Sequence, residues 1–431
     1  MANTFDTSKI KDIYSSTSHN VNTNHPLTPN SQEYISYKKF VSIHSEDRDI
    51  VKYPVSSQFE IELPEDYANV SSIRLLQWTF PANYNVFSGL SQNVTMTFQI
   101  KNPYNPGQYN VSETYYERIF QALWYNQTHY YLVIIEEGFY NPSQMSIELT
   151  NKFNNVVSIK IREYFTSNGW NDTLQEFNNN GGYNRFNVVY NNVSLKLWFG
   201  NTADGFILTN ETSLIENNIT NNLCFIGRKQ VPSSSDWGLP NNLGLNRCNT
   251  NSVSSSEYNI DDPNAAIYGN IVVPRFFYGD VSQGDDGYWL LPLDLAGCQV
   301  HWVEATNKLN LMGPAYLYME LDGFNCIDET QPYNANEFTL TTNQTNGIVN
   351  AAFAKMSIPS TPLSQWFDRD SVPYKFFYPP AERIRKLSFR VRYHNGQLVD
   401  FGVFNFSFML EFSLLVPQIL RNTKTVVYPM R

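Results

Sequence analysis

The strongest constraint on the fold is the stretch 383–415, in which apolar and polar residues alternate twice around an Asn395-Gly396 pair. Alternation with a period of two is typical of a strand that has one buried face. Asn-Gly tolerates the positive φ angles of a tight turn and is the strongest short-range hairpin signal. The pattern therefore predicts a β-hairpin with a fixed register, because a slip of one residue would expose every large apolar side chain of the second arm.

The alternation also predicts which side chains of this hairpin point inward. The inward set is Leu387, Phe389, Val391 and Tyr393 in the first arm, and Phe404, Phe406, Phe408, Leu410, Phe412 and Leu414 in the second. The outward set is Ser388, Arg390, Arg392 and His394, then Asn405, Ser407, Glu411 and Ser413. The structural candidates are therefore Asn395 and Gly396 in the turn and Phe404, Phe406 and Phe408 in the second arm, while Arg390 and Arg392 on the polar face are interface candidates.

Composition agrees with a mainly β protein. Aromatic residues make up 15% of the chain and charged residues only 16%, so its polarity comes largely from Asn, Ser, Thr and Gln, which favours strands and long loops over helices. The net charge of −10 opposes nonspecific binding to nucleic acid, because neutralising phosphates requires a surplus of Lys and Arg. The N-terminal residues lack the apolar core of a signal peptide, and no apolar run approaches the ~18 residues of a membrane span. We therefore expect synthesis in the cytosol and no transmembrane segment.

The predicted domain organisation has three parts. Residues 1–35 are polar and interrupted by prolines, which predicts an extended arm without a core of its own. No repeat or low-complexity linker divides residues 36–417, so we expect one continuous β-sandwich there, followed by a tail over 418–431. Residues 213–264 lose their periodicity and are too long for an ordinary connection, which predicts a large surface excursion or an interface loop. Trp237, inside that excursion, is the third interface candidate.

Other strands follow from the same alternation. One includes Phe59, Ile61 and Leu63 and is expected to end at Pro64. Residues 71–81 and 94–100 predict two more strands, and three strands over 185–210 are expected to form a meander.

Two short helices are predicted from their N-terminal signals. Thr114 and Glu117 have the spacing of a capping box ahead of an amphipathic stretch. Asn141 as N-cap and Pro142 as the first helical residue begin the second helix. The apolar stripes of both helices are interpreted as core packing.

No catalytic or metal-binding pattern emerges from the chain. The six His residues form neither an HExxH motif nor a pair with a GxSxG serine, and no Gly-rich phosphate loop is present. The four Cys residues are far apart without a CxxC pair, so reduced buried thiols are expected in place of a zinc site. We expect no cofactor and no enzymatic activity.

Acidic clusters are the remaining candidates for chemistry. They are Glu46/Asp47/Asp49, Asp261/Asp262 and Asp285/Asp286. Paired carboxylates can serve a glycoside hydrolase, which is a remote alternative, but acids beside Gly or Pro are more often solvated turns. Arg48 stands between acids, so Asp47, Arg48 and Asp49 are predicted to form a structural ion-pair network at a strand end. The many Tyr residues leave a second alternative, a glycan-binding protein of a virion surface.

Three motifs in consistent order resemble the penton-like and minor capsid proteins of nucleocytoplasmic large DNA viruses, or giant viruses. They are SEDRDIVKYPVSSQFEIELPEDYANVSSIRLLQWTFP, EEGFYNPSQMSIELTNKFN and YHNGQLVDFGVFNFSFMLEF, within about Phe40 to Leu415. The resemblance implies a jelly-roll-type antiparallel β-sandwich that stabilises an icosahedral shell as a minor capsid, penton or vertex component. It also implies a location in the virion, contacts with major capsid protein and other minor capsid proteins, and self-association at a vertex. It transfers no catalytic, cofactor-binding or metal-binding residue to this chain.

Overall fold

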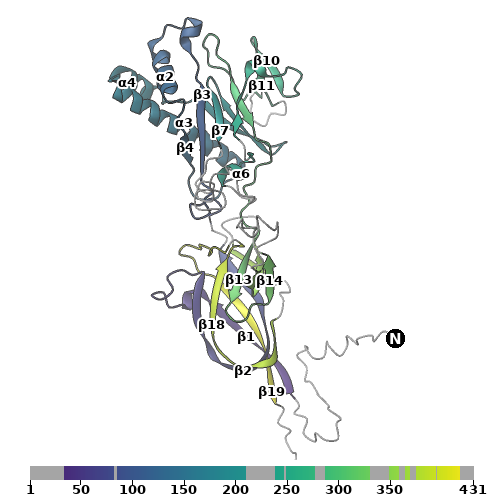
Figure 1. Ribbon diagram of the computed structural model, residues 1–431. Coiled ribbons are helices and arrows are strands. Elements are labelled where there is room, and N and C mark those ends of the chain that lie inside the picture. The colour runs from purple at the N-terminus through teal and green to yellow at the C-terminus, as the bar shows by residue number, and fades with distance from the viewer. Residues whose placement is uncertain are drawn as a thin grey trace, which may run out of the picture. The chain divides into compact units, whose positions relative to one another are not determined.

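A computed structural model describes residues 34–81, 85–209, 238–246, 249–276, 287–330, 349–358, 365–368, 375–394 and 396–417 (Figure 1). The chain divides into two compact units, and the range 36–417 is therefore not a single unit. Unit 1 draws its residues from Met1–Tyr84, Pro314–Pro332 and Gly347–Arg431, and the described part of unit 2 lies within Asn85–Gly313. The predicted arm before residue 36 and tail after residue 417 lie almost entirely outside the described residues and stay predictions.

Unit 1 is built on a seven-stranded sheet that curls around its own core (Figure 1). The strands follow the order β1 (Tyr34–His44), β19 (Ser407–Pro417), β2 (Gln58–Pro81), β18 (Lys375–Arg392), β13 (Tyr316–Leu321) and β16 (Ala354–Ser357), and β17 (Gln365–Asp368) also pairs with β2. Strands β14 (Ile327–Thr330) and β15 (Val349–Ala352) form a separate pair. The core is apolar and rich in Phe, and it includes Phe59, Leu321, Phe353, Leu410 and Phe412.

The predicted hairpin of residues 383–415 is wrong in its pairing. Both arms are strands, β18 and β19, but β2 lies between them and pairs with each. A local reversal does form, because the amide of Gly396 donates to the carbonyl of Tyr393 and the amide of Val399 donates to that of Val391. The chain then continues to the far side of β2. Alternation predicts strands and their faces but says nothing about the partner strand.

Most inward residues of the two arms are buried as predicted, including Leu387, Phe389, Phe406 and Phe408. The inward prediction for Phe404 is wrong, since its side chain is 52% exposed in the segment that precedes β19. Three outward predictions are also wrong, because Arg392, Glu411 and Ser413 are buried, with exposed fractions of 2%, 1% and 9%. Ion pairs, described below, explain how these two charges lie beneath the surface.

Strand β2 replaces two predicted strands and runs for 24 residues. The break expected at Pro64 is absent, because the pairing of β2 with β18 shifts register between the Ile384–Tyr67 and Lys386–Glu62 pairs. Pro64 lies within that irregularity. A proline is tolerated at such a bulge, where its missing amide does not interrupt the ladder.

Unit 2 contains two four-stranded sheets and several helices. One sheet has the order β4 (Tyr131–Ile134), β3 (Thr95–Asn102), β7 (Gly205–Thr209) and β8 (Thr250–Asn251). The other has the order β5 (Phe186–Asn191), β6 (Lys196–Asn201), β12 (His301–Glu304) and β9 (Val253–Ser254), and β10 (Ala265–Tyr268) pairs with β11 (Ile271–Pro274). The helices are α2 (Thr114–Tyr125), α3 (Pro142–Ser167), α4 (Asn171–Asn179) and α6 (Leu239–Asn242), and short 3-10 turns lie at Ser45–Asp47, Pro106–Tyr109 and Ser255–Glu257.

Helix α3 packs against residues from both sheets of unit 2. The Phe98 ring of β3 stacks on Phe153 of α3 with centroids 4.4 Å apart and on Tyr131 at 5.1 Å. The same Phe98 ring meets Phe186 of β5 edge-on at 5.2 Å. These buried rings join α3 to β3 and β5 in one core. The predicted meander is therefore only partly right, since β5 pairs with β6 whereas β7 pairs with β3.

Both predicted helices are present. Helix α3 begins as expected, because the Asn141 side chain accepts from the amide of Gln144 while the Gln144 side chain accepts from the amide of Asn141. At 26 residues it is not short. Helix α2 also begins at Thr114, but its N-cap is Glu113 and no side chain caps it, so the predicted capping box is wrong.

The excursion predicted over 213–264 is only partly within the described residues. From residue 238 onward the segment contributes α6, β8 and β9, and Leu239, Leu243 and Leu245 are buried. The residues around Leu239 to Leu245 are therefore packed into unit 2, whereas most of residues 249–264 lie at its surface. The mainly β, antiparallel fold class is confirmed, since every recorded strand pairing among the described residues is antiparallel. Among the helices that the structure describes, none combines the length and apolarity needed to cross a membrane.

Candidate functional site

Arg48 organises the turn between β1 and β2 through carbonyl groups. Its guanidinium donates to the carbonyl of Ser45 at 2.6 Å and to that of Tyr53 at 3.0 Å. It also donates to the side-chain oxygen of Asn405 at 2.9 Å, which ties the turn to the segment that leads into β19. The predicted ion-pair network is wrong in its chemistry, because the described residues show no ion pair between Arg48 and an acid.

The neighbouring acids of this turn have different surroundings. Asp49 closes the turn by accepting from the amides of Val51 and Lys52 at 3.0 and 3.1 Å. Asp47 is exposed. The structural role of these candidates stays a prediction, and the geometry shows a hydrogen-bonded loop in place of a catalytic or metal-binding cluster.

Exposed ion pairs run across the polar face of the unit 1 sheet. Lys386 of β18 lies 3.5 Å from Glu60 and 3.2 Å from Glu62 of β2. Arg390, one of the interface candidates, pairs with Glu320 of β13 at 3.1 Å, and its side chain is half exposed. Exposed pairs of this kind contribute little to folding, because solvent screens the charges. Their arrangement gives this face charges of alternating sign.

Two further ion-pair clusters in unit 1 are buried. Arg392 of β18 pairs with Glu320 and, at 2.7 Å, with Glu329 of β14. Glu411 of β19 forms ion pairs with Lys38 of β1 at 3.0 Å and with Arg74 of β2 at 2.8 Å. The second cluster therefore connects three adjacent strands. The burial of Arg392 removes it from the exposed face on which its interface role was predicted.

Unit 2 holds a third buried charge, Asp204, which follows β6. One carboxylate oxygen accepts from the amide of Tyr104 at 2.8 Å. The other accepts from the hydroxyl of Tyr183 at 2.8 Å and from the guanidinium of Arg185 at 2.9 Å. Burial, together with the Asp204 carboxylate, raises the pKa of Tyr183 well above its ordinary value, so Tyr183 stays a hydrogen-bond donor. These donors together give hydrogen bonds to both oxygens of the buried carboxylate.

Among the described residues, the remaining titratable groups do not assemble into a reaction centre. Burial raises the pKa of the Cys298 thiol to about 11, which opposes thiolate formation at neutral pH. Asp262 accepts from the amide of Asn264 at 2.8 Å in a surface turn, while Asp285 and Asp286 lie outside the described residues. No group of three or more metal-ligating side chains occurs within the described ranges.

His301 is expected to make unit 2 sensitive to acid. Burial lowers the pKa of His301, against the opposing effect of Asp204 and Glu257. An unfolded His has a pKa of about 6.5, so below that pH the unfolded state binds more protons than the folded state. The free energy of unfolding should therefore fall as the pH drops through the window between the two values.

The measurement is urea denaturation at several pH values from about 5 to about 7, with the unfolding of unit 2 followed by hydrogen exchange because the two units need not unfold together. His301→Gln should show a flatter pH dependence than the parent chain, and His44→Gln, at a more exposed His of unit 1, is the control. An unchanged slope for His301→Gln would contradict the expectation. Burial also lowers the pKa of His129, which accounts for pH dependence that remains in the variant.

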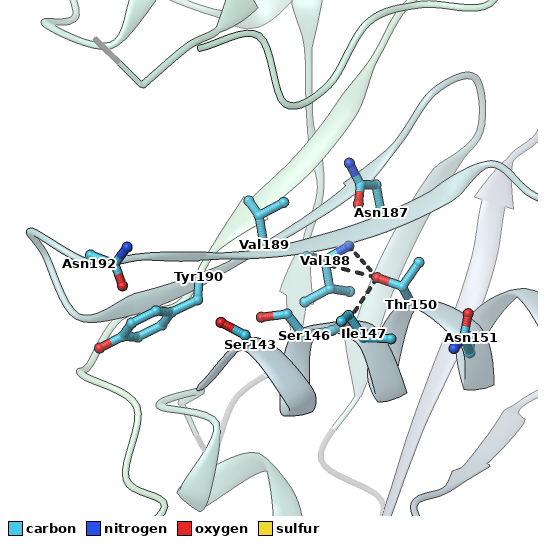
Figure 2. A pocket seen from close by; sticks show the side chains of 10 residues that line it. All are labelled: Ser143, Ser146, Ile147, Thr150, Asn151, Asn187, Val188, Val189, Tyr190 and Asn192. Carbon is cyan, nitrogen blue, oxygen red and sulfur yellow. Dashed lines mark hydrogen bonds between the residues drawn. The ribbon is translucent and has the colours of Figure 1, made fainter. Parts of the chain in front are cut away.

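A groove lies between helix α3 and strand β5 (Figure 2). It has a volume of about 340 Å³, near the lower end of the range for small-molecule sites. Its lining carries hydroxyl, amide and aliphatic groups and no formal charge. The lining residues are Ser143, Ser146, Ile147, Thr150 and Asn151 of α3 with Asn187, Val188, Val189, Tyr190 and Asn192 of β5 and the turn after it.

The groove was not predicted, although part of its signal is visible in the sequence. Ser146, Thr150, Asn154 and Ser158 recur every four residues, which is the spacing of one helical face. Of the predicted site residues, Arg48 reaches the segment of Phe404 through Asn405. Arg390 and Arg392 both pair with Glu320, and the Phe406 and Phe408 rings stack with centroids 6.1 Å apart. Trp237 and Asn395 lie outside the described residues.

Comparison with known proteins finds similarity only among solved structures. No family model matches the chain. No curated protein sequence matches it either. A mavirus penton protein aligns over 89% of this chain and 99% of its own, with 9% identity and a TM-score of 0.33. A chain of the Sputnik virophage aligns over 89% of this chain and 98% of its own, with 10% identity and a TM-score of 0.37. TM-scores at this level indicate weak structural similarity, although the alignments cover most of each chain.

Proposed function

We propose that this chain is a structural protein of an icosahedral virus capsid, as a penton, vertex or other minor capsid component. The observation that carries the proposal is the place of the three sequence motifs in the fold. The first, residues 45–81, forms the Arg48 turn and the whole of β2, which pairs with β17, β18 and β19. The resemblance to capsid proteins therefore falls on the central strand of unit 1.

The other two motifs also fall on framework elements. Residues 136–154 form the capped start of α3, whose Phe153 packs among the rings of the unit 2 core. Residues 393–412 form the connection into β19 and half of that strand. What resembles capsid proteins is thus the scaffold of both units. A chain whose resemblance to capsid proteins lies in its framework strands and helix suits an architectural role.

The partners follow from the same proposal. They are the major capsid protein, other minor capsid proteins and, at a vertex, further copies of this chain. The alternating charges around Arg390 and Lys386 are an exposed surface through which such contacts could be made. The two similar solved structures, a penton protein and a virophage, agree with a place in the virion, although the proposal does not depend on them.

The test is to purify particles and to quantify this chain by mass spectrometry against the major capsid protein. A shell component should keep a constant ratio through density gradients and high-salt washes, whereas an adhering protein should be depleted. An abundant host protein measured in the same fractions is the control. Absence of the chain from washed particles would overturn the proposal, and a map of the intact particle would assign its position.

A further inference from the structure

Helix α3 covers the free edge of strand β5 with a ladder of polar side chains. Ser158 accepts from the amide of Tyr183 at 2.8 Å, ahead of the strand. Asn154 accepts from the amide of Phe186 at 2.9 Å and donates to its carbonyl at 2.8 Å. Thr150 accepts from the amide of Val188 at 2.9 Å. These side chains take the place of a neighbouring strand at an edge that would otherwise be open.

This series of hydrogen bonds ends at Val188, one alternate residue before Tyr190. Backbone groups of alternate residues in a strand point to the same side, so those of Tyr190 face α3 as those of Phe186 and Val188 do. The next helix residue in the series is Ser146, and its hydroxyl donates to the carbonyl of Pro142 at 2.9 Å instead of reaching β5. The groove opens at this position, with the Tyr190 ring beside Ser143 and Ser146 (Figure 2).

The groove combines polar groups that both donate and accept hydrogen bonds with a small apolar surface. Ser143, Asn151 and Asn192 contribute exposed hydroxyl and amide groups. The Tyr190 ring and the 62% exposed Ile147 contribute the apolar part. The nearest charged residues of the helix, Glu148 and Lys152, lie 3.5 Å from each other and do not line the groove.

We propose that this groove binds a neutral glycan of one or two sugar rings. Sugar hydroxyls donate and accept at once, which suits the Ser and Asn groups and the open backbone position of Tyr190. The C–H face of a sugar ring can pack on the aromatic ring of Tyr190. The absence of Lys and Arg from the lining disfavours sulfated or sialylated glycans. An extended peptide that pairs with a strand edge would need several backbone positions free for hydrogen bonding. The side chains of α3 leave one such position on β5.

The test is a glycan array probed with the purified full-length chain. Neutral glycans should bind, and acidic glycans should show no preference. Tyr190→Ala should lower the affinity for the best-binding neutral glycan by about tenfold, which corresponds to about 1.4 kcal/mol of binding free energy. Tyr125→Ala, which removes an exposed Tyr of helix α2 outside the groove, is the matched control and should bind as the parent does.

A second variant separates loss of binding from loss of folding. Ser143→Glu places a charge and added bulk in the groove at an exposed position in the first turn of α3, where an acid is compatible with the helix. It should fold normally and also lose binding. The inference fails if the parent chain binds no neutral glycan, if both variants retain binding, if acidic glycans are preferred, or if peptides bind in place of glycans. None of these outcomes depends on whether the chain is found in particles.

Discussion

Replacing Asp204 by Asn is expected to lower the free energy of unfolding of unit 2 by about 3 to 5 kcal/mol, because it leaves a buried guanidinium without its counter-charge. Asp204 is fully buried and accepts from Tyr104, Tyr183 and Arg185. Asparagine keeps the shape but has a single acceptor oxygen, so its amide group must face one of these donors. The donors that stabilise the carboxylate therefore destabilise an amide at the same position.

Hydrogen exchange is the appropriate measurement, because the chain has two units and a single unfolding transition cannot be assumed. Protection should fall in α3, β5 and β6 and stay unchanged in the strands of unit 1. Glu163→Gln is the matched control, since it removes an exposed ion pair with Lys160 at 2.8 Å and should cost less than about 1 kcal/mol. A comparably small effect for Asp204→Asn would show that the buried network is not required.

The second large effect is expected for Phe408→Ala, which should destabilise unit 1 by about 3 to 5 kcal/mol. Phe408 is 2% exposed, and its ring lies 4.7 Å from that of Phe389 on β18. Removing the ring leaves a cavity between two strands that both pair with β2. Hydrogen exchange in β2, β18 and β19 measures the loss.

Phe404→Ala provides the control for this prediction. Phe404 has the same position in the alternation as Phe408 but is 52% exposed, so its truncation should cost less than about 1 kcal/mol. Similar losses for the two variants would contradict the burial described here. A loss below about 1 kcal/mol for Phe408→Ala would show that β19 does not contribute to the core.

The contrast between these two residues shows what periodicity can and cannot predict. Within 383–415, alternation correctly predicts two strands, which are parts of β18 and β19, and the burial of Phe406 and Phe408. It cannot locate the first residue of a strand, and Phe404 precedes β19. It also cannot predict pairing, because β2, which separates the two strands, lies hundreds of residues away in the chain.

Charged residues were predicted less well than apolar ones. Arg392 and Glu411 are in outward positions by alternation, yet cross-strand partners bury both. Those partners come from β13, β14, β1 and β2, so no local pattern could indicate them. Asp204 is similar, because its donors lie in separate segments of chain. Composition and spacing do not reveal which charges will meet.

The groove was missed for a related reason. The apolar stripe of α3 predicts a helix that packs on a core, and this is confirmed by Met145, Leu149 and Phe153. The polar series of Thr150 and Asn154 is ordinarily assigned to solvent in such a helix. Only the arrangement of β5 beside the helix shows that these residues bond a strand edge and that the position at Tyr190 is left open.

The position of β19 between β1 and β2 also sets the order in which the protein can fold during synthesis. Among the described strands, Tyr34–His44 pairs with Ser407–Pro417, so this part of the sheet cannot form until residue 417 has left the ribosome. The described part of unit 2 comes from a continuous stretch and can fold earlier. Until β19 emerges, β1 and one edge of β2 remain open to mispairing, which makes chaperone binding to nascent chains most needed at that stage.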